Sequence, residues 1–347
     1  MLLPLLLPLA LASLTTTSPA PLAPKTVHPF NWASTKHLIA FGDSYTFVQG
    51  TTGHPNYSFI GDNLAPAFTP QQLLSNRIVQ NLTGTAEGGP NWIELLTNCG
   101  AREGLTSPLR CARQLWDFAY AGANTLEDAS FTPLHHAHTV SLTAQIAQFK
   151  SYGDPALTQS GVIRQGKKGS DVLVALWIGI NDINDLASLR GRNATFAPLY
   201  ERVQSRQFEL VEQLYDLGYR HFLFLNLPPL DRGPSPNVNA SMVSTFNDIL
   251  KEHADEWQAQ HMDASVLLFD VNTVLNGVLD EYEKYGFTNV TGYCAAYNQP
   301  DIRTDPGKYG CKPLREYFWY NSGHLTSRTH EIFTASLLEF LKGRSRA

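Results

Sequence analysis

The stretch HLIAFGDSYTFVQG, residues 37–50, decides how the rest of the chain is interpreted. Residues 37–41 are a short apolar run of the kind that forms a buried strand. Gly42, Asp43 and Ser44 follow directly as a small polar turn. A serine in this place is either an ordinary turn residue or a nucleophile at the end of a strand. The later segments of the chain distinguish the two.

Strand-like and helix-like segments alternate from residue 37 to the end. Continuous apolar runs predict four further strands, at residues 118–121, 171–178, 220–226 and 265–270. Apolar stripes with helical spacing predict helices over residues 203–217 and 242–257, and a last helix that starts at Thr326 or Ser327 and stops before Gly343. This alternation predicts an α/β fold, a parallel sheet covered by helices on both faces, whose site lies at the carboxyl ends of the strands.

Length, composition and charge limit the classes of function. The chain has 347 residues, is 43% hydrophobic and carries a formal net charge of −5, so it lacks the basic surplus that a nucleic-acid partner requires. Residues 1–14, MLLPLLLPLALASL, predict a secretory signal peptide. We expect residues 1–23 to hold this peptide and the start of an N-terminal arm, and residues 24–347 to form a single domain. No later segment is apolar enough to predict stable membrane insertion.

Cysteines and glycosylation motifs agree with a secreted, extracellular protein. The four cysteines fall into two locally close pairs, which suggests Cys99–Cys111 and Cys294–Cys311 among three connectivities. No Cys-x-x-Cys motif occurs, which disfavours a metal or redox site. Five sequons offer candidate glycosylation sites. They begin at Asn56, Asn81, Asn193, Asn239 and Asn289.

Polar residues follow the predicted strands at the positions where a site is expected. Ser44 follows the first strand, Gly122 the second and Asn181 the third, and His324 stands just before the last helix. Acyl transfer needs a serine activated by an imidazole and donors aimed at the oxyanion of the tetrahedral intermediate. Ser44 with His324 meets the first need, and the backbone N–H groups of Ser44 and Gly122 with the Asn181 amide meet the second.

Four ordered blocks carry a resemblance to a known family. FGDSY, FAYAGANT, GIND and NSGH resemble, in order, the four blocks of the SGNH or GDSL hydrolases. The segments GGPNWIELL and LNLPPLDRGP are similar to the fungal secreted branch, acetylesterases of carbohydrate esterase family 16. The resemblance implies a three-layer α/β/α sandwich with a flavodoxin-like sheet, Ser44 as nucleophile, His324 as base, and Gly122 and Asn181 as oxyanion donors. Gly89 is the weaker candidate for the glycine.

One position departs from the family pattern. The family usually has Asp three residues before the histidine, where this chain has Asn321. An amide in place of the acid can favour the wrong imidazole tautomer, although Cys-His-Asn arrangements work on other folds. Three hypotheses follow: Asn321 orients His324, a backbone carbonyl or another acid orients it, or catalysis is weak. The candidate acids are Asp301, Asp305 and Glu316.

The resemblance implies a carboxylic ester hydrolase that removes acetyl groups from carbohydrates such as hemicellulose oligosaccharides through an acyl-enzyme, with no metal or organic cofactor. Two alternatives stay open, a lipase or phospholipase of the same superfamily and a carbohydrate-binding protein that has lost catalysis. Tyr45 and Trp92 are the candidate pocket residues. Activity is expected to rise as His324 loses its proton, toward neutral pH.

Overall fold

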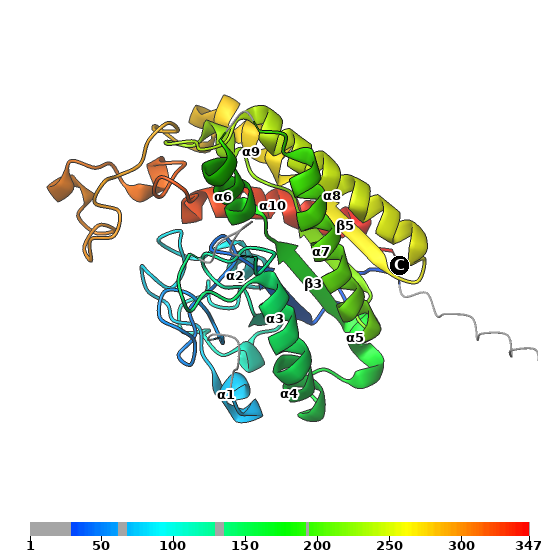
Figure 1. The fold of residues 1–347 in the computed structure, drawn as a ribbon. Coiled ribbons are helices and arrows are strands. Elements are labelled where there is room, and N and C mark those ends of the chain that lie inside the picture. Colours follow the sequence, from blue (N-terminus) through cyan, green and yellow to red (C-terminus); the bar gives the residue numbers. More distant parts are fainter. Residues whose placement is uncertain (1–28, 62–67, 129–134, 192–193, 347) are drawn as a thin grey trace, which may run out of the picture.

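The computed structural model describes residues 29–61, 68–128, 135–191 and 194–346 (Figure 1). The predicted signal peptide and the sequon at Asn193 lie outside these residues. The described helices include none that is both long and apolar enough to cross a membrane.

A five-stranded parallel sheet forms the centre of the molecule (Figure 1), with strand order β2-β1-β3-β4-β5. Its members are β1 His37–Gly42, β2 Gln114–Asp117, β3 Val172–Trp177, β4 His221–Leu225 and β5 Ser265–Phe269. All residues of β1, β3 and β4 are buried, as their continuous apolar character predicted. The strand predictions at residues 37–41, 171–178, 220–226 and 265–270 are therefore confirmed.

The second strand lies earlier in the chain than predicted. The run at residues 118–121 was expected to be the strand, but β2 ends at Asp117. The strand prediction is wrong because Asp117 turns the chain: its carboxylate accepts hydrogen bonds from the backbone N–H groups of Val48 and Ala119. Residues 118–121 still lie beside the end of β1, where Phe118 donates to Ala40 and Tyr120 to Gly42.

Helices cover both faces of the sheet. On one face α3 contacts β1 and α7, and α7 contacts α8; on the other α2 contacts β1, β2 and α10, and α10 contacts α9. The predicted helices are present as α7 Ala197–Asp216, α8 Ala240–Gln260 and α10 Ser327–Arg344, the last capped by Thr326. The predicted end of the last helix is wrong, because α10 continues through Gly343 to Arg344. The remaining helices are α1 Pro70–Ser75, α2 Trp92–Thr97, α3 Leu142–Gln148, α4 Asp154–Gln159, α5 Lys168–Asp171, α6 Ile180–Arg190 and α9 Val271–Asp280. The layers form the predicted three-layer α/β/α sandwich.

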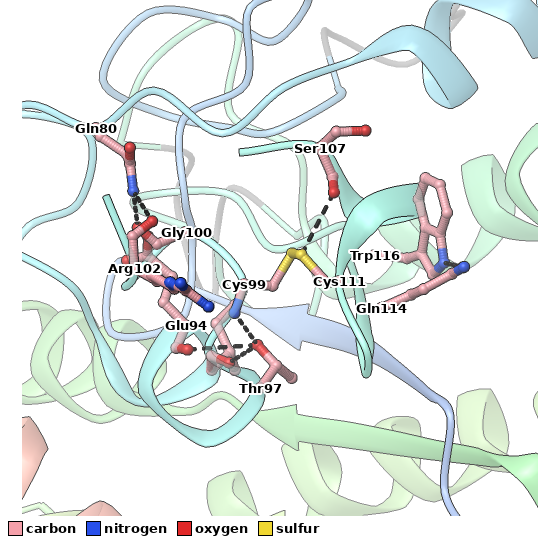
Figure 2. Close-up of a disulfide and its surroundings, with 11 residues drawn as sticks. Gln80, Glu94, Thr97, Cys99, Gly100, Arg102, Ser107, Cys111, Gln114 and Trp116 are labelled. Atoms are coloured by element: carbon pink, nitrogen blue, oxygen red, sulfur yellow. Dashed lines mark hydrogen bonds between the residues drawn. A yellow bond between two sulfur atoms is a disulfide. The ribbon is translucent and has the colours of Figure 1, made fainter. Parts of the chain in front are cut away.

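Both suggested disulfides are present. Cys99–Cys111 joins the turn after α2 to the segment that enters β2, and the Thr97 hydroxyl accepts a hydrogen bond from the Cys99 N–H beside it (Figure 2). Cys294–Cys311 closes a loop in the segment before α10, which projects at the left of Figure 1 and is drawn in orange. The described residues contain no free cysteine.

Candidate active site

The turn after β1 presents Ser44 because Asp43 holds the residues that follow it. The Asp43 carboxylate accepts a hydrogen bond from the Tyr45 N–H (3.0 Å), and its carbonyl accepts from the N–H groups of Thr46 and Phe47. The N–H of Ser44 itself donates no hydrogen bond to any residue that the structure describes. The turn therefore leaves one backbone donor beside the serine hydroxyl.

His324 lies against Ser44, although 280 residues separate the two in the chain. Nε2 of His324 is 2.8 Å from Oγ of Ser44. His324 is at the end of a tight turn in which Tyr320 N–H donates to the His324 carbonyl (2.8 Å). The Tyr45 hydroxyl donates to the Gly323 carbonyl (2.6 Å), so the residue after the serine also holds the histidine turn.

Asn321 lies within hydrogen-bond distance of the imidazole. Its Oδ1 is 2.9 Å from Nδ1 of His324 and accepts a hydrogen bond from the Gly323 N–H, also at 2.9 Å. Because an N–H can donate only to an acceptor, Gly323 fixes the amide with its oxygen toward the ring. Nδ1 must then carry the proton, and the lone pair of Nε2 faces Ser44. The amide therefore selects the imidazole tautomer that a general base requires.

The other acids considered for this task are engaged elsewhere. Asp301 binds Lys308 and Tyr309, Asp305 caps the turn that begins after it, and Glu316 accepts from the Thr288 hydroxyl. Of the three hypotheses for His324, the geometry fits orientation by Asn321.

Burial keeps His324 neutral. Removal from water lowers the pKa of His324 to about 4, although the residue is only half-buried and faces the cavity. An amide adds no negative charge that would raise this pKa. An imidazole with this pKa is unprotonated, and available as a base, from mildly acidic pH upward.

Gly122 follows the segment after β2 with φ +82°, a left-handed conformation that favours glycine. Its neighbours Ala121 and Ala123 donate their N–H groups to the carbonyls of Tyr57 and Tyr120. The N–H of Gly122 has no acceptor among the described residues. It is a second backbone donor beside the cavity.

Asn181 supplies a third donor at the start of α6. One of its two amide hydrogens goes to the Ala123 carbonyl (2.8 Å), which leaves the other available, and Asn181 lines the cavity. Gly179 allows α6 to begin immediately after β3, because it has φ +110° and a Cβ there would lie 2.5 Å from the Phe246 ring.

A cavity of ≈ 550 Å³ joins the predicted residues. Its lining includes Ser44, Gly122, Asn181, Asn321 and His324. Gly89, the weaker candidate, is not among the described lining residues, and a Cβ on it would press against Ser327.

The two candidate pocket aromatics differ in position. Tyr45 contributes to the cavity lining, but it is fully buried and mainly supports the histidine turn. The prediction for Trp92 is wrong: it is fully buried beside Trp177, and its indole N–H donates to Thr46. A large ring at the start of α2 packs between that helix and the sheet, so Trp92 is part of the hydrophobic core.

Sequence reasoning missed two residues that hold the site together. The buried carboxylate of Asp182 accepts hydrogen bonds from the N–H (3.0 Å) and the hydroxyl of Thr125, which ties the Gly122 loop to α6. Burial raises the pKa of Asp182 to about 7. Gln145 of α3 binds both the N–H and the carbonyl of Gly42. Asp182 lies inside the GIND motif, whereas Gln145 has no local signal.

The candidate glycosylation sites differ in their surroundings. Asn56 is exposed and contributes to the lining of the cavity, and Asn81 is exposed as well. Asn239 caps α8 through a hydrogen bond from the Met242 N–H, and Asn289 accepts from Gly292.

Residues 38–337 match the model of the GDSL-like lipase/acylhydrolase family. The chain belongs to this family. Among relatives of this GDSL hydrolase, an acetylesterase from Thermothelomyces thermophilus is 28% identical over 277 residues, 75% of this chain and 78% of the relative. An acetylesterase from Hypocrea jecorina is 22% identical over 349 residues, 90% of each chain. These relatives and the family make the protein a carboxylic ester hydrolase.

Solved structures resemble the GDSL hydrolase at low sequence identity. An alpha/beta hydrolase enzyme from the metagenome of Lake Arreo is 15% identical, with a TM-score of 0.42 over 90% of this chain and 97% of the other. A lipase/acylhydrolase from Enterococcus faecalis is 11% identical, with a TM-score of 0.38 over 90% and 98%.

Proposed function

We propose that this GDSL hydrolase is a secreted esterase that removes acetyl groups from carbohydrates through an acyl-enzyme, with Ser44 as nucleophile and His324 as base. The 2.8 Å contact between Ser44 Oγ and His324 Nε2 carries the proposal, because Asn321 fixes the tautomer that makes Nε2 the acceptor. A protein that only binds carbohydrate has no need of this arrangement.

The first half of the reaction acylates the serine. Ser44 Oγ attacks the acetyl carbonyl carbon while His324 Nε2 takes the hydroxyl proton. The carbonyl oxygen becomes an oxyanion, which accepts hydrogen bonds from the N–H groups of Ser44 and Gly122 and from the Asn181 amide. The intermediate then collapses: the ester C–O bond breaks, and His324 returns the proton to the departing sugar oxygen.

The second half releases acetate. Water gives a proton to His324 Nε2 as its oxygen attacks the acetyl carbonyl, and the same donors hold the second oxyanion. The bond to Ser44 Oγ breaks, Oγ recovers the proton, and acetic acid leaves.

Three features support the substrate and the location. The two fungal relatives are named acetylesterases. The cavity mixes aromatic rings with amides, including Tyr57, Tyr297 and Asn298, a combination suited to the apolar faces and hydroxyl groups of a sugar. Two disulfides suit an oxidising compartment outside the cytosol.

Rates on p-nitrophenyl acetate, p-nitrophenyl palmitate and acetylated xylo-oligosaccharides test the proposal. We expect hydrolysis of the acetate and release of acetate from the oligosaccharides, and at least about a thousandfold loss in Ser44→Ala with its fold retained. Preference for the palmitate would indicate a lipase instead. Failure of a fluorophosphonate to label Ser44 in the folded protein would indicate a binding protein.

A further inference from the structure

We propose that the enzyme has an anionic-sugar subsite next to the catalytic cavity, in which Arg303 and Arg315 bind a uronate carboxylate of the substrate. This inference rests on the proposed function, because it names the class of saccharide that the site takes. It predicts a preference for acidic over neutral acetylated saccharides.

The three arginines line one cavity of ≈ 420 Å³. Arg328 is already paired with Glu331 at 2.6 Å. Arg303 and Arg315 are exposed and form no ion pair or side-chain hydrogen bond with any residue that the structure describes. The chain as a whole has a formal net charge of −5. Two unpaired guanidinium groups therefore give this one cavity a positive charge on a protein that is negative overall.

The other polar groups of this cavity leave the positive charge uncancelled. Glu87 is buried, and burial together with the nearby Glu94 holds the pKa of its carboxyl well above the usual range. Glu331 is offset by Arg328. The first residues of α10, beginning at Ser327, also line the cavity, and the start of a helix adds a partial positive charge. The cavity is therefore suited to an anion.

A third cavity of ≈ 330 Å³ borders both this subsite and the catalytic cavity. It shares Thr85 with the catalytic cavity and shares Gly89, Pro90 and Arg303 with the arginine-lined cavity. Arg303 also acts electrostatically on Tyr320, whose side chain lines the catalytic cavity. In the proposed complex, a saccharide with its acetyl group at Ser44 reaches the arginines with another of its sugar units.

The backbone that carries Arg303 is held in place. It lies in the loop closed by Cys294–Cys311, and its neighbour Ile302 is fully buried against Cys294 and Tyr317. A fixed backbone lowers the entropy lost on binding. Guanidinium groups pair with carboxylates in two parallel hydrogen bonds, which favours a uronate over a neutral sugar.

Two acetylated xylo-oligosaccharides that differ only in a glucuronate substituent test the subsite. We expect the wild type to show a lower KM for the acidic one, and the double variant Arg303→Gln/Arg315→Gln to lose about tenfold of that preference. Added salt is expected to reduce the preference in the wild type. Arg110→Gln is the matched control, because Arg110 is an exposed arginine outside all three cavities.

Equal KM values for the two substrates in the wild type, or an unchanged preference in the double variant, would overturn the inference. Calorimetric binding of the glucuronate-bearing oligosaccharide to Ser44→Ala separates this failure from failure of the proposed function. The subsite stands if binding weakens about tenfold in Ser44→Ala/Arg303→Gln/Arg315→Gln relative to Ser44→Ala, even where acetate release is not observed. Equal binding affinity with and without the arginine substitutions overturns the inference, even where the esterase activity is confirmed.

Discussion

Oδ1 of Asn321 lies 2.9 Å from Nδ1 of His324 and is turned toward it by the N–H of Gly323. An amide placed opposite a histidine without such a partner is free to present its NH₂ group, which favours the unproductive tautomer. The Gly323 N–H removes that freedom. We therefore expect a chain with Asn where the family usually has Asp to keep the orienting function and to give up only the charge.

Loss of the amide tests this orienting role. In Asn321→Ala, Nδ1 loses its acceptor and the ring can take the other tautomer, so we expect kcat on p-nitrophenyl acetate to fall about a hundredfold or more. Ser322→Ala is the matched control, because Ser322 is the exposed neighbour in the same turn. An Asn321→Ala enzyme as fast as this control would contradict the role.

The pH profile of the wild type is expected to extend into acid. The base must be neutral, and burial lowers the pKa of His324 to about 4, so kcat/KM should rise with pH through about 4 and level off above it. The rise of kcat/KM with pH is therefore expected at a lower pH than the near-neutral rise that an ordinary histidine would give. A profile of kcat/KM from pH 3 to 8 measures it, and a midpoint near about 6.5, the ordinary value for histidine, would refute the effect of burial.

A carboxylate at position 321 should move the midpoint of this pH profile to higher pH. In Asn321→Asp the negative charge stabilises the imidazolium, which raises the pKa of His324, so we expect the midpoint to shift by about one to three pH units to higher pH. Activity at pH 5 then falls relative to the wild type, whereas activity at pH 8 is retained or increased. Profiles of the two enzymes measured side by side show the shift, and coinciding midpoints would contradict it.

The Asn181 amide is expected to act in the transition state. Asn181→Ala should lower kcat about a hundred- to a thousandfold with little change in KM. The reason is that the Asn181 amide binds the oxyanion of the transition state more strongly than the carbonyl oxygen of the bound ester. Asn181→Asp keeps the shape but replaces the donor with a negative charge, so its loss should be larger. Equal kcat values for Asn181→Ala and the wild type would exclude this role.

Gly179 is expected to be needed for the junction between β3 and α6. Gly179→Ala places a Cβ 2.5 Å from Phe246 at a φ of +110°, so we expect a loss of about 2–4 kcal/mol in the free energy of unfolding. Gly277→Ala is the matched control in α9, where a Cβ meets no atom within 4 Å and alanine should stabilise by up to about 1 kcal/mol. Urea unfolding measures both, and similar stabilities for the two variants would contradict the packing argument.

The sequence by itself determined four of the five strands, the long helices and the four blocks in which the site residues lie. These follow from local patterns: buried parallel strands are continuously apolar, and site residues follow directly after strand ends. The run at residues 118–121 was misplaced because its apolar character looks like a strand, whereas the turn depends on Asp117 binding Val48 across 69 residues. Trp92 was misplaced because the local sequence around an aromatic residue near a motif does not distinguish a pocket residue from a core residue.

Only the tertiary structure decided how His324 is oriented and which groups support it. The direction of the Asn321 amide depends on a backbone N–H two residues away, and the hold of Gln145 on Gly42 depends on a helix that packs against β1. Likewise, the arginines that line one cavity come from positions 303, 315 and 328, which no local motif joins. Hydrogen bonds and charges act through space, so residue spacing alone does not reveal them.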